Sequence, residues 1–303
     1  MLERNIVATD VNPYAVLLTK AKLHPPYTLE GALEKADFCL KQSERLSGQI
    51  AWQEIPRWVR SFFHPRTLRE ILALVEVLRY ERQSFLLACL LGILHHQRPG
   101  FLSYPASHLV PYLRTRNFPK ERYPELYEYR PIRPRLFAKI QRIYKRFPTI
   151  DPRLFKKCLR RDVAHLRLPK GSLDAVITSP PYMNALDYGR DNRLRLWFLG
   201  VRQTQRYDKR TDSQQRFLLL MERCLSTLRY SLKKNGSCVL VIGEVGRSRR
   251  PVNAAKLVMD IAVNKLGGFH QQEIIEDVIP DIRRARREGK STKKEWIIVL
   301  TRR

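Results

Sequence analysis

The sequence predicts an α/β protein, in which strands and helices alternate along the chain and a mainly helical insertion interrupts them. Residues 4–21 predict a first strand and helix. Residues 173–178 form a short apolar run that ends in two prolines, and residues 213–243 predict a long amphipathic helix followed by an apolar strand. A hydrophobic content of 44% in 303 residues supports a folded core rather than disorder.

The first predicted strand ends at Asp10. Asn12 is suited to capping a helix, and Pro13 fits the first turn of that helix because an N–H group there would have no helical partner. An acidic residue at the end of such a strand can bind ribose hydroxyl groups. The alternative is an Asp that only caps a turn, and Asp10 taken alone favours that alternative.

The middle of the chain contains a predicted helical region followed by an irregular, proline-rich region. Residues 35–100 are predicted to be helical, with a buried helix over 85–94, because apolar residues recur at helical spacing. Residues 97–135 contain many prolines, and their arginines alternate with Tyr and Phe, as a surface that binds phosphates and stacks on bases requires. An irregular loop whose aromatic side chains pack on the helices explains them equally well. Residues 137–147 predict a basic amphipathic helix.

Residues 173–178 predict a buried strand, and Pro180 and Pro181 end it because proline lacks an N–H group and fixes φ. The result is a rigid turn at the carboxyl end of a strand, where ligands bind in open α/β sheets. A carbonyl beside Ser179 could accept hydrogen bonds from an exocyclic amino group, and Tyr182 offers a flat face for a base. A purely structural turn explains these four residues about equally well.

The elements after this turn are expected to complete the sheet. We expect, in order, a helix that ends at Asn235-Gly236, a strand, a helix and two antiparallel strands: residues 213–233, 237–243, 252–266, 273–279 and 296–300.

Basic residues strongly outnumber acidic ones. The 57 Lys and Arg against 29 Asp and Glu give a formal net charge of +28 and a pI near 10.3. Such an excess favours a polyanionic partner over a merely solvated basic surface. The segment before the last strand concentrates this charge in Arg283, Arg284, Arg286 and Arg287. It predicts a clamp for phosphates, with a solvated loop as the alternative.

The five cysteines are scattered and odd in number, which indicates reduced thiols. The Cys and His spacings match no metal site, so the sequence predicts no metal. The chain begins with charged residues rather than a signal peptide, and its longest apolar run, residues 85–94, is too short to cross a bilayer. We therefore expect a cytoplasmic protein without a membrane partner.

Ser179-Pro180-Pro181-Tyr182, with the strings 183–188 and 193–200 that follow it, resembles the catalytic motif of S-adenosylmethionine-dependent amino-methyltransferases acting on DNA. Asp10-Val11-Asn12-Pro13 and residues 166–172 match two further parts of the pattern of that family, in the expected order. The resemblance implies transfer of a methyl group from S-adenosylmethionine to an exocyclic amino group of a DNA base, without a covalent intermediate.

The same resemblance implies a domain organisation and a substrate. Residues 1–34 and 151–303 would form a Rossmann-like methyltransferase sheet, and residues 35–150 an insertion that recognises the target. Ser179 favours N4 of cytosine over N6 of adenine, as in the methylases of restriction–modification systems. C5-cytosine methylation is not expected, because none of the cysteines follows a proline.

The resemblance implies a role for individual residues. The catalytic turn consists of Ser179 and the Pro180 carbonyl, which would orient the amine, Pro181, and Tyr182, which would stack on the base. The cofactor would be held by Asp10, Asn12 and Asp162. DNA would be contacted by Arg114, Arg116 and Lys120, with Arg283, Arg284, Arg286 and Arg287.

The chain departs from the family in one respect. The glycine-rich loop of such folds stands about 20 residues before the acidic residue, yet the first glycine here is Gly31. The expected explanation is a start codon placed too late; a partner chain that supplies the first strand, or a degenerate remnant, are the others. An RNA base amino-methyltransferase, or an inactive methylase that only binds nucleic acid, remain the alternative functions.

Overall fold

The computed structural model describes most of the chain: residues 3–95, 101–107, 111–146, 151–182, 188–204, 213–243, 253–279 and 294–303. Two compact units result. The helical unit comprises Met1–Arg160 and Arg190–Thr204, and the sheet unit comprises Arg161–Gly189 and Gln205–Arg303.

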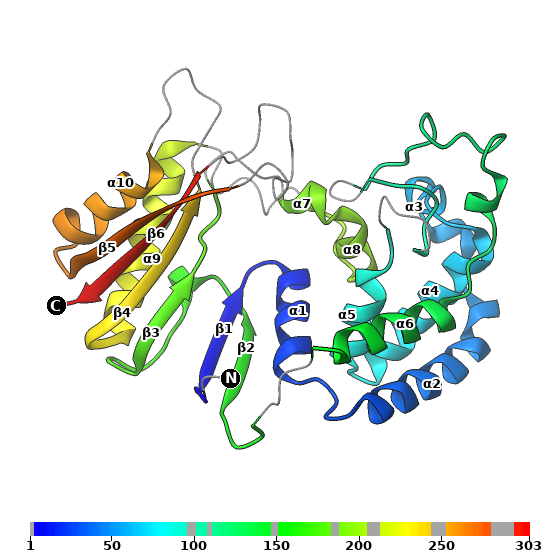
Figure 1. Cartoon of the computed structure of the whole chain (residues 1–303), viewed down its shortest axis with the longest axis horizontal. Coiled ribbons are helices and arrows are strands. Elements are labelled where there is room, and N and C mark those ends of the chain that lie inside the picture. The colour runs from blue at the N-terminus through cyan, green and yellow to red at the C-terminus, as the bar shows by residue number, and fades with distance from the viewer. Residues whose placement is uncertain are drawn as a thin grey trace. The chain divides into compact units, whose positions relative to one another are not determined.

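The helical unit contains two short parallel strands and most of the helices (Figure 1). Its strands are β1 (Ile6–Asp10) and β2 (Lys156–Arg160), and its helices are α1 (Pro13–Leu23), α2 (Leu29–Leu46), α3 (Arg57–Arg60), α4 (Pro65–Tyr80), α5 (Ser84–Gly92), α6 (Ile132–Tyr144) and α8 (Arg193–Phe198). The segment α7 (Tyr188–Asp191) lies where the two units join along the chain.

Helix α5 forms the centre of the helical unit. All of its residues from Phe85 to Leu91 are buried, and α2, α4 and α6 contribute further buried side chains to the same cluster. The predicted strand and helix at the start of the chain are confirmed. Asn12 caps α1 by accepting a hydrogen bond from the Tyr14 N–H at 2.9 Å, and Pro13 occupies its first turn.

The sheet unit contains four strands in the order β3-β4-β6-β5. These are β3 (Leu173–Thr178), β4 (Leu232–Gly243), β5 (Phe269–Val278) and β6 (Lys294–Arg302), with helices α9 (Gln214–Ser231) and α10 (Ala254–Asp260), the latter continued by a π-helical turn, Ile261–Lys265. Strands β3 and β4 are parallel, and β6 runs antiparallel to both of its neighbours. The molecule is therefore α/β, with the Rossmann-like crossover and the antiparallel final pair that the sequence predicts.

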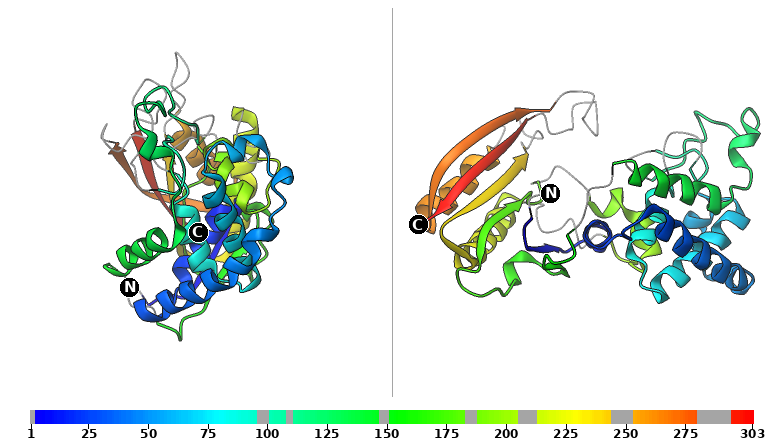
Figure 2. Two further views of the ribbon diagram at one scale, coloured as in Figure 1. Left: turned by 90° about the vertical axis from the view of Figure 1, so that its right-hand side faces the viewer. Right: turned by 60° about the horizontal axis from the view of Figure 1, so that its bottom comes forward.

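One face of this sheet is covered. Helices α9 and α10 lie on the same side of the strands (Figure 2). Alternate residues of β4 and β6, such as Cys238, Leu240 and Leu300, are fully buried in a cluster with both helices. Period-two burial of this kind follows from the opposite directions of successive side chains in a strand.

Two expectations about these elements were wrong in detail. Strand β3 is not buried, because it lies at the edge of the sheet and leaves Ile177 78% exposed. Helix α9 ends at Ser231, and Asn235, with φ of 63°, lies within β4 instead of capping the helix. A Cβ on Gly236 would lie 2.9 Å from the Lys233 carbonyl oxygen, so the close approach of backbone there explains the glycine.

Helix α6 begins at Ile132, five residues before the predicted start. Pro134 falls in its first turn, where a missing N–H group costs nothing, so this proline does not break the helix. His95, which follows α5, is buried, and its Nδ1 lies 3.1 Å from the Ser107 carbonyl oxygen. None of the described helices is both long and apolar enough to cross a membrane.

Candidate active site

The Ser-Pro-Pro-Tyr turn directly follows β3. The ladder between β3 and β4 ends at the pair Thr178–Leu240, after which Pro180 and Pro181 have no N–H group with which to continue it. Ser179 is exposed, whereas Tyr182 is half-buried. The turn therefore presents a hydroxyl group and an aromatic ring at the carboxyl end of a parallel strand pair.

The Tyr182 hydroxyl donates a hydrogen bond to the Glu295 carboxylate. Glu295 is the second residue of β6 and pairs with Gly243, the last residue of β4. Because β6 is antiparallel to β4, its beginning lies at the carboxyl end of β3 and β4, beside the turn. Burial, then the bond to Glu295, raises the pKa of Tyr182, while a hydrogen bond with the Ser179 side chain opposes the shift. The phenol is held neutral between Ser179 and Glu295.

Glu295 was not identified from the sequence. It is separated from Tyr182 by 113 residues. The only signal is a carboxylate near the start of an otherwise apolar strand, at the end where the sheet binds ligands. This signal does not show that β6 begins beside the turn, which depends on the pairing of β6 with β4.

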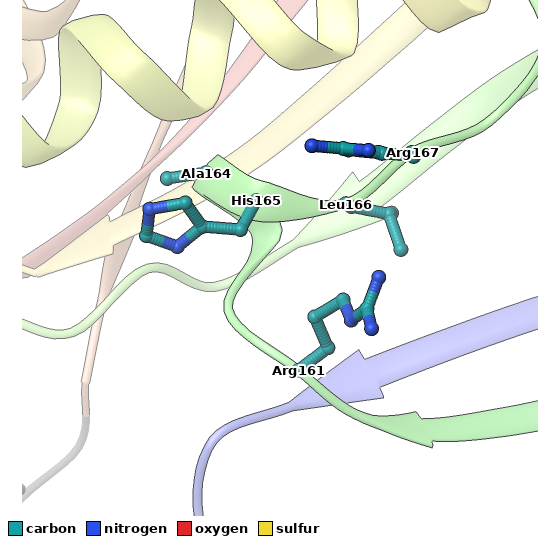
Figure 3. Close-up of a pocket in the computed structure, with 5 residues that line it drawn as sticks. All are labelled: Arg161, Ala164, His165, Leu166 and Arg167. Atoms are coloured by element: carbon teal, nitrogen blue, oxygen red, sulfur yellow. The ribbon is translucent and has the colours of Figure 1, made fainter.

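Asp162 caps the short 3₁₀ helix Val163–His165 by accepting a hydrogen bond from the Ala164 N–H at 3.0 Å. Next to it lies a pocket of 590 Å³, lined by Arg161, Ala164, His165, Leu166 and Arg167. Figure 3 shows the five lining residues, with the His165 ring pointing away from the Arg161 guanidinium. The structure thus shows the turn-capping role of Asp162; its contact with a cofactor stays a prediction.

Asp10 and Asn12 lie at the junction of β1 and α1. An Asp10 carboxylate oxygen accepts a hydrogen bond from the Asn12 N–H at 2.7 Å. Loss of surrounding water raises the pKa of Asp10, and the N–H groups of Asn12 and Val11 act in the opposite direction. Asn12 uses its side-chain oxygen to cap α1. This geometry fits a turn; a ribose-binding role for Asp10 remains a prediction.

The predicted site residues fall into both units. Asp10 and Asn12 belong to the helical unit, and Asp162 with the turn Ser179–Tyr182 belongs to the sheet unit. Within the sheet unit, the structure brings together Ser179, Tyr182 and Glu295.

The predicted DNA-contacting residues of the helical unit lie on an irregular segment. Arg116 and Lys120 are exposed, and the Arg114 guanidinium lies over the Phe118 ring, 5.4 Å from its centroid. Tyr104 and Tyr127 pack on each other with ring centroids 4.9 Å apart, so for this pair the packing interpretation holds. Tyr112, at 53% exposure, remains available for stacking.

The four arginines of the predicted phosphate clamp, Arg283, Arg284, Arg286 and Arg287, lie outside the described residues. Within the described ranges, groups of three or more His, Cys, Asp or Glu side chains that could hold a metal ion do not occur. All five cysteines lie in these ranges and none forms a disulfide. Burial raises the pKa of Cys238 to about 12, so it is a core residue rather than a nucleophile.

Comparison with known proteins gives no family model that matches and no match among curated proteins. Several solved structures are similar at low level, among them the following three. TTHA0409 of Thermus thermophilus, a proposed DNA modification methylase in complex with S-adenosyl-L-methionine, is 19% identical over 46% of this chain and 49% of its own, with a TM-score of 0.28. This chain therefore spans about half the length of TTHA0409.

The other two are methyltransferases as well. The N-methyltransferase NodS of Bradyrhizobium japonicum, in complex with S-adenosyl-L-homocysteine, is 11% identical over 56% of this chain and 62% of its own, with a TM-score of 0.28. A SAM-dependent methyltransferase of Methanosarcina mazei is 8% identical over 54% of this chain and 76% of its own, with a TM-score of 0.29. At these values the likeness assigns neither a family nor an activity to this chain.

Proposed function

We propose that this protein transfers a methyl group from S-adenosylmethionine to an exocyclic amino group of a DNA base, with N4 of cytosine favoured over N6 of adenine. The observation that supports this most directly is the Ser179–Tyr182 turn at the carboxyl end of β3, with its phenol hydrogen-bonded to Glu295. The net charge of +28 supports a nucleic-acid substrate.

The chemistry follows from the groups in the turn. The Ser179 hydroxyl and the Pro180 carbonyl would accept hydrogen bonds from the amine, which draws its lone pair out of conjugation and makes it a better nucleophile. Tyr182 would stack on a base taken out of the duplex, at a cost of a few kcal/mol. Glu295 is a positioning residue, because it acts through the Tyr182 hydroxyl. The bound cofactor would supply the methyl group, and the amine would lose a proton to water.

The residues that are present fit such a cofactor in part. Asp10 ends β1 with a carboxylate that can bind ribose hydroxyl groups, and Asp162 follows the neighbouring parallel strand β2. These two residues are proposed to hold the nucleoside part of S-adenosylmethionine.

Substitution of Ser179→Ala or Tyr182→Ala tests the proposed activity. Each should lower incorporation of labelled methyl groups into DNA at least about a hundredfold, since removing one preorganised group from a transition state has an effect of this order. Ser172→Ala and Tyr230→Ala are matched controls, because both side chains are exposed in the same unit. Methylation of tRNA but not DNA would identify the RNA enzyme, and activity retained by both Ser179→Ala and Tyr182→Ala would exclude this turn.

The role of Glu295 needs a separate test. Glu295→Ala should lower the methylation rate about tenfold, whereas Glu295→Gln keeps an acceptor for the phenol and should restore most of it. Tyr182→Phe and Glu295→Ala each remove the same hydrogen bond. The loss of methylation rate in the double variant Tyr182→Phe/Glu295→Ala should therefore be smaller than the sum of the losses in the two single variants. Glu276→Ala is the control, since Glu276 pairs with Lys294 in the same sheet. Additive losses would show that Glu295 acts independently of Tyr182.

The DNA surface of the helical unit is tested by charge reversal at Arg114, Arg116 and Lys120. DNA binding should weaken and its dependence on salt should flatten, because each lost phosphate contact lowers the slope of log K against log salt by about 0.9. Fluorescence anisotropy at several salt concentrations measures both quantities. Unchanged binding would remove these residues from the interface.

A further inference from the structure

A second cavity lies within the helical unit, whereas the predicted catalytic turn belongs to the sheet unit. It has a volume of 580 Å³ and is bounded by the end of α1, the start of α2, the turn between α4 and α5, and β2. Its lining includes five cationic side chains, here called the basic cleft: Lys20, Lys35, Arg82, Lys156 and Lys157. Among the described residues, its lining contains no Asp or Glu. A cavity with this charge favours a ligand that carries several negative charges.

Arg82 occupies a backbone position that favours glycine. Its φ is 53°, and it follows the last turn of α4, where the Gln83 N–H closes a hydrogen bond to the Leu78 carbonyl at 2.8 Å. A side chain in this left-handed conformation costs on the order of 1 kcal/mol relative to glycine. The helix end alone does not call for an arginine, and this one lines the basic cleft, where it can contact an anionic ligand.

Tyr27 borders the same cleft on a second Pro-Pro-Tyr turn, residues 25–27. The Pro26 carbonyl accepts a hydrogen bond from the Tyr144 hydroxyl at 2.6 Å, and Pro25 is buried, so the turn is fixed to the helical unit. The Tyr27 ring is nevertheless 74% exposed. An exposed ring on an anchored turn is a stacking surface that loses little entropy when it binds.

We propose that the basic cleft binds single-stranded nucleic acid, with phosphates against Lys20, Lys35 and Arg82 and one base stacked on Tyr27. A groove that tracks the backbone beside an aromatic platform is the general arrangement for binding single strands. The inference rests on the nucleic-acid partner of the proposed function, but not on methyl transfer.

The stacking part is tested on the full-length chain with a short labelled single-stranded oligonucleotide. Tyr27→Ala should weaken binding about tenfold, and Tyr27→Phe should bind like the unsubstituted chain, because the ring and not the hydroxyl does the stacking. The high exposure of Tyr27 keeps folding unaffected, which circular dichroism verifies. Equal affinities for the alanine variant and the unsubstituted chain would overturn the proposal.

The phosphate part is tested with Lys20→Gln/Lys35→Gln/Arg82→Gln. Each phosphate contact with a single strand contributes about 0.7 to the slope of log K against log salt. Loss of three contacts should therefore lower the magnitude of this slope by about 2. The matched control, Lys170→Gln/Arg223→Gln/Lys256→Gln, removes the same charge from exposed positions of the sheet unit. An equal fall in both triple variants would show that overall charge, not the cleft, binds the strand.

Inorganic tripolyphosphate distinguishes a strand from free phosphate. It should compete weakly with the oligonucleotide, and its own binding should depend on Arg82 and the two lysines but not on Tyr27. Tighter binding of tripolyphosphate than of the oligonucleotide would overturn a strand as the ligand. Failure of the unsubstituted chain to bind any nucleic acid would overturn the proposed function as well, whereas normal binding insensitive to Tyr27 and the cleft would overturn this inference alone.

Discussion

The helical unit and the sheet unit bury their apolar side chains in different ways. In the helical unit, α5 is surrounded by other helices, and every side chain from Phe85 to Leu91 is buried. In the sheet unit, α9 and α10 cover one face of the strands, and both edge strands expose apolar residues, with Ile177 at 78% and Val278 at 56%. The helical unit has the closed core, and the sheet unit carries the candidate catalytic turn at an open edge.

The use of arginine differs as well. Arg60 and Arg69 both lie over the Trp52 ring, with distances to its centroid of 5.8 and 5.0 Å. Arg130 is buried and donates to the carbonyl oxygens of Phe101, Ser103 and Leu126, at 2.6, 2.8 and 2.9 Å. Part of the large positive charge therefore holds the helical unit together and is not available to a ligand. Net charge alone overstates the surface that can bind nucleic acid.

Core truncation should separate the two units most clearly. Leu90→Ala in α5 should lower the free energy of unfolding by about 2–5 kcal/mol, because it leaves a cavity at a fully buried position. Ile177→Ala in β3 should cost less than about 1 kcal/mol, since that side chain is mostly in water. Urea denaturation measures both. Similar losses would show that Ile177 is covered in solution.

Removing buried arginine donors should have the next largest effect. Arg130→Met should lower the free energy of unfolding by roughly 3 kcal/mol. The three carbonyl oxygens that accept hydrogen bonds from its guanidinium would then lack a charged donor. Arg229 makes one such bond, from its Nη1 to the Leu266 carbonyl at 2.7 Å, so Arg229→Met in the sheet unit should cost about 1 kcal/mol. Arg142→Met, at an exposed position on α6, is the neutral control. Equal costs at Arg130 and Arg142 would contradict the role assigned to Arg130.

Alkaline pH should have a smaller effect. Burial raises the pKa of Cys89 from 9.0 to about 12, so its thiol stays protonated in the folded chain while the unfolded chain ionises. The contribution of the protonated Cys89 thiol to the free energy of unfolding is fully present below pH 9. It is lost as the pH rises from 9 to about 12, because ionisation then favours the unfolded chain. By pH 10 the loss should be about 1.4 kcal/mol. Cys89→Ala should remove this part of the pH dependence, and a parallel decline in both proteins would assign it to other groups.

Local signals predicted much of the fold. Asn12 and Pro13 predicted the start of α1, and short apolar runs located β4 and β6, because caps and apolar runs depend on neighbouring residues only. The start of α6 was missed because Pro134 can either break a helix or occupy its first turn. The exposure of β3 was missed because an apolar run does not reveal whether a strand is at the centre or the edge of a sheet.

The candidate site was predictable in its motif but not in its surroundings. Ser179–Tyr182 could be found because proline punctuates the chain, and the contact with Glu295 could not, since it depends on the antiparallel start of β6. Tyr27 and the basic cleft were missed for the same reason, because segments far apart in sequence form the lining. The roles of Asp10 and Asp162 toward a cofactor, and the explanations for the absent glycine loop, stay predictions.

The open edge at β3 has a consequence for handling the protein. An edge strand offers unpaired N–H and C=O groups to any extended segment, and Ile177 adds an apolar side chain that water contacts. Crowded solutions of the pure protein should therefore aggregate by adding strands at this edge. The substitution Ile177→Lys introduces the device that natural sheets use against such growth, and it would extend the concentration range in which the protein can be studied.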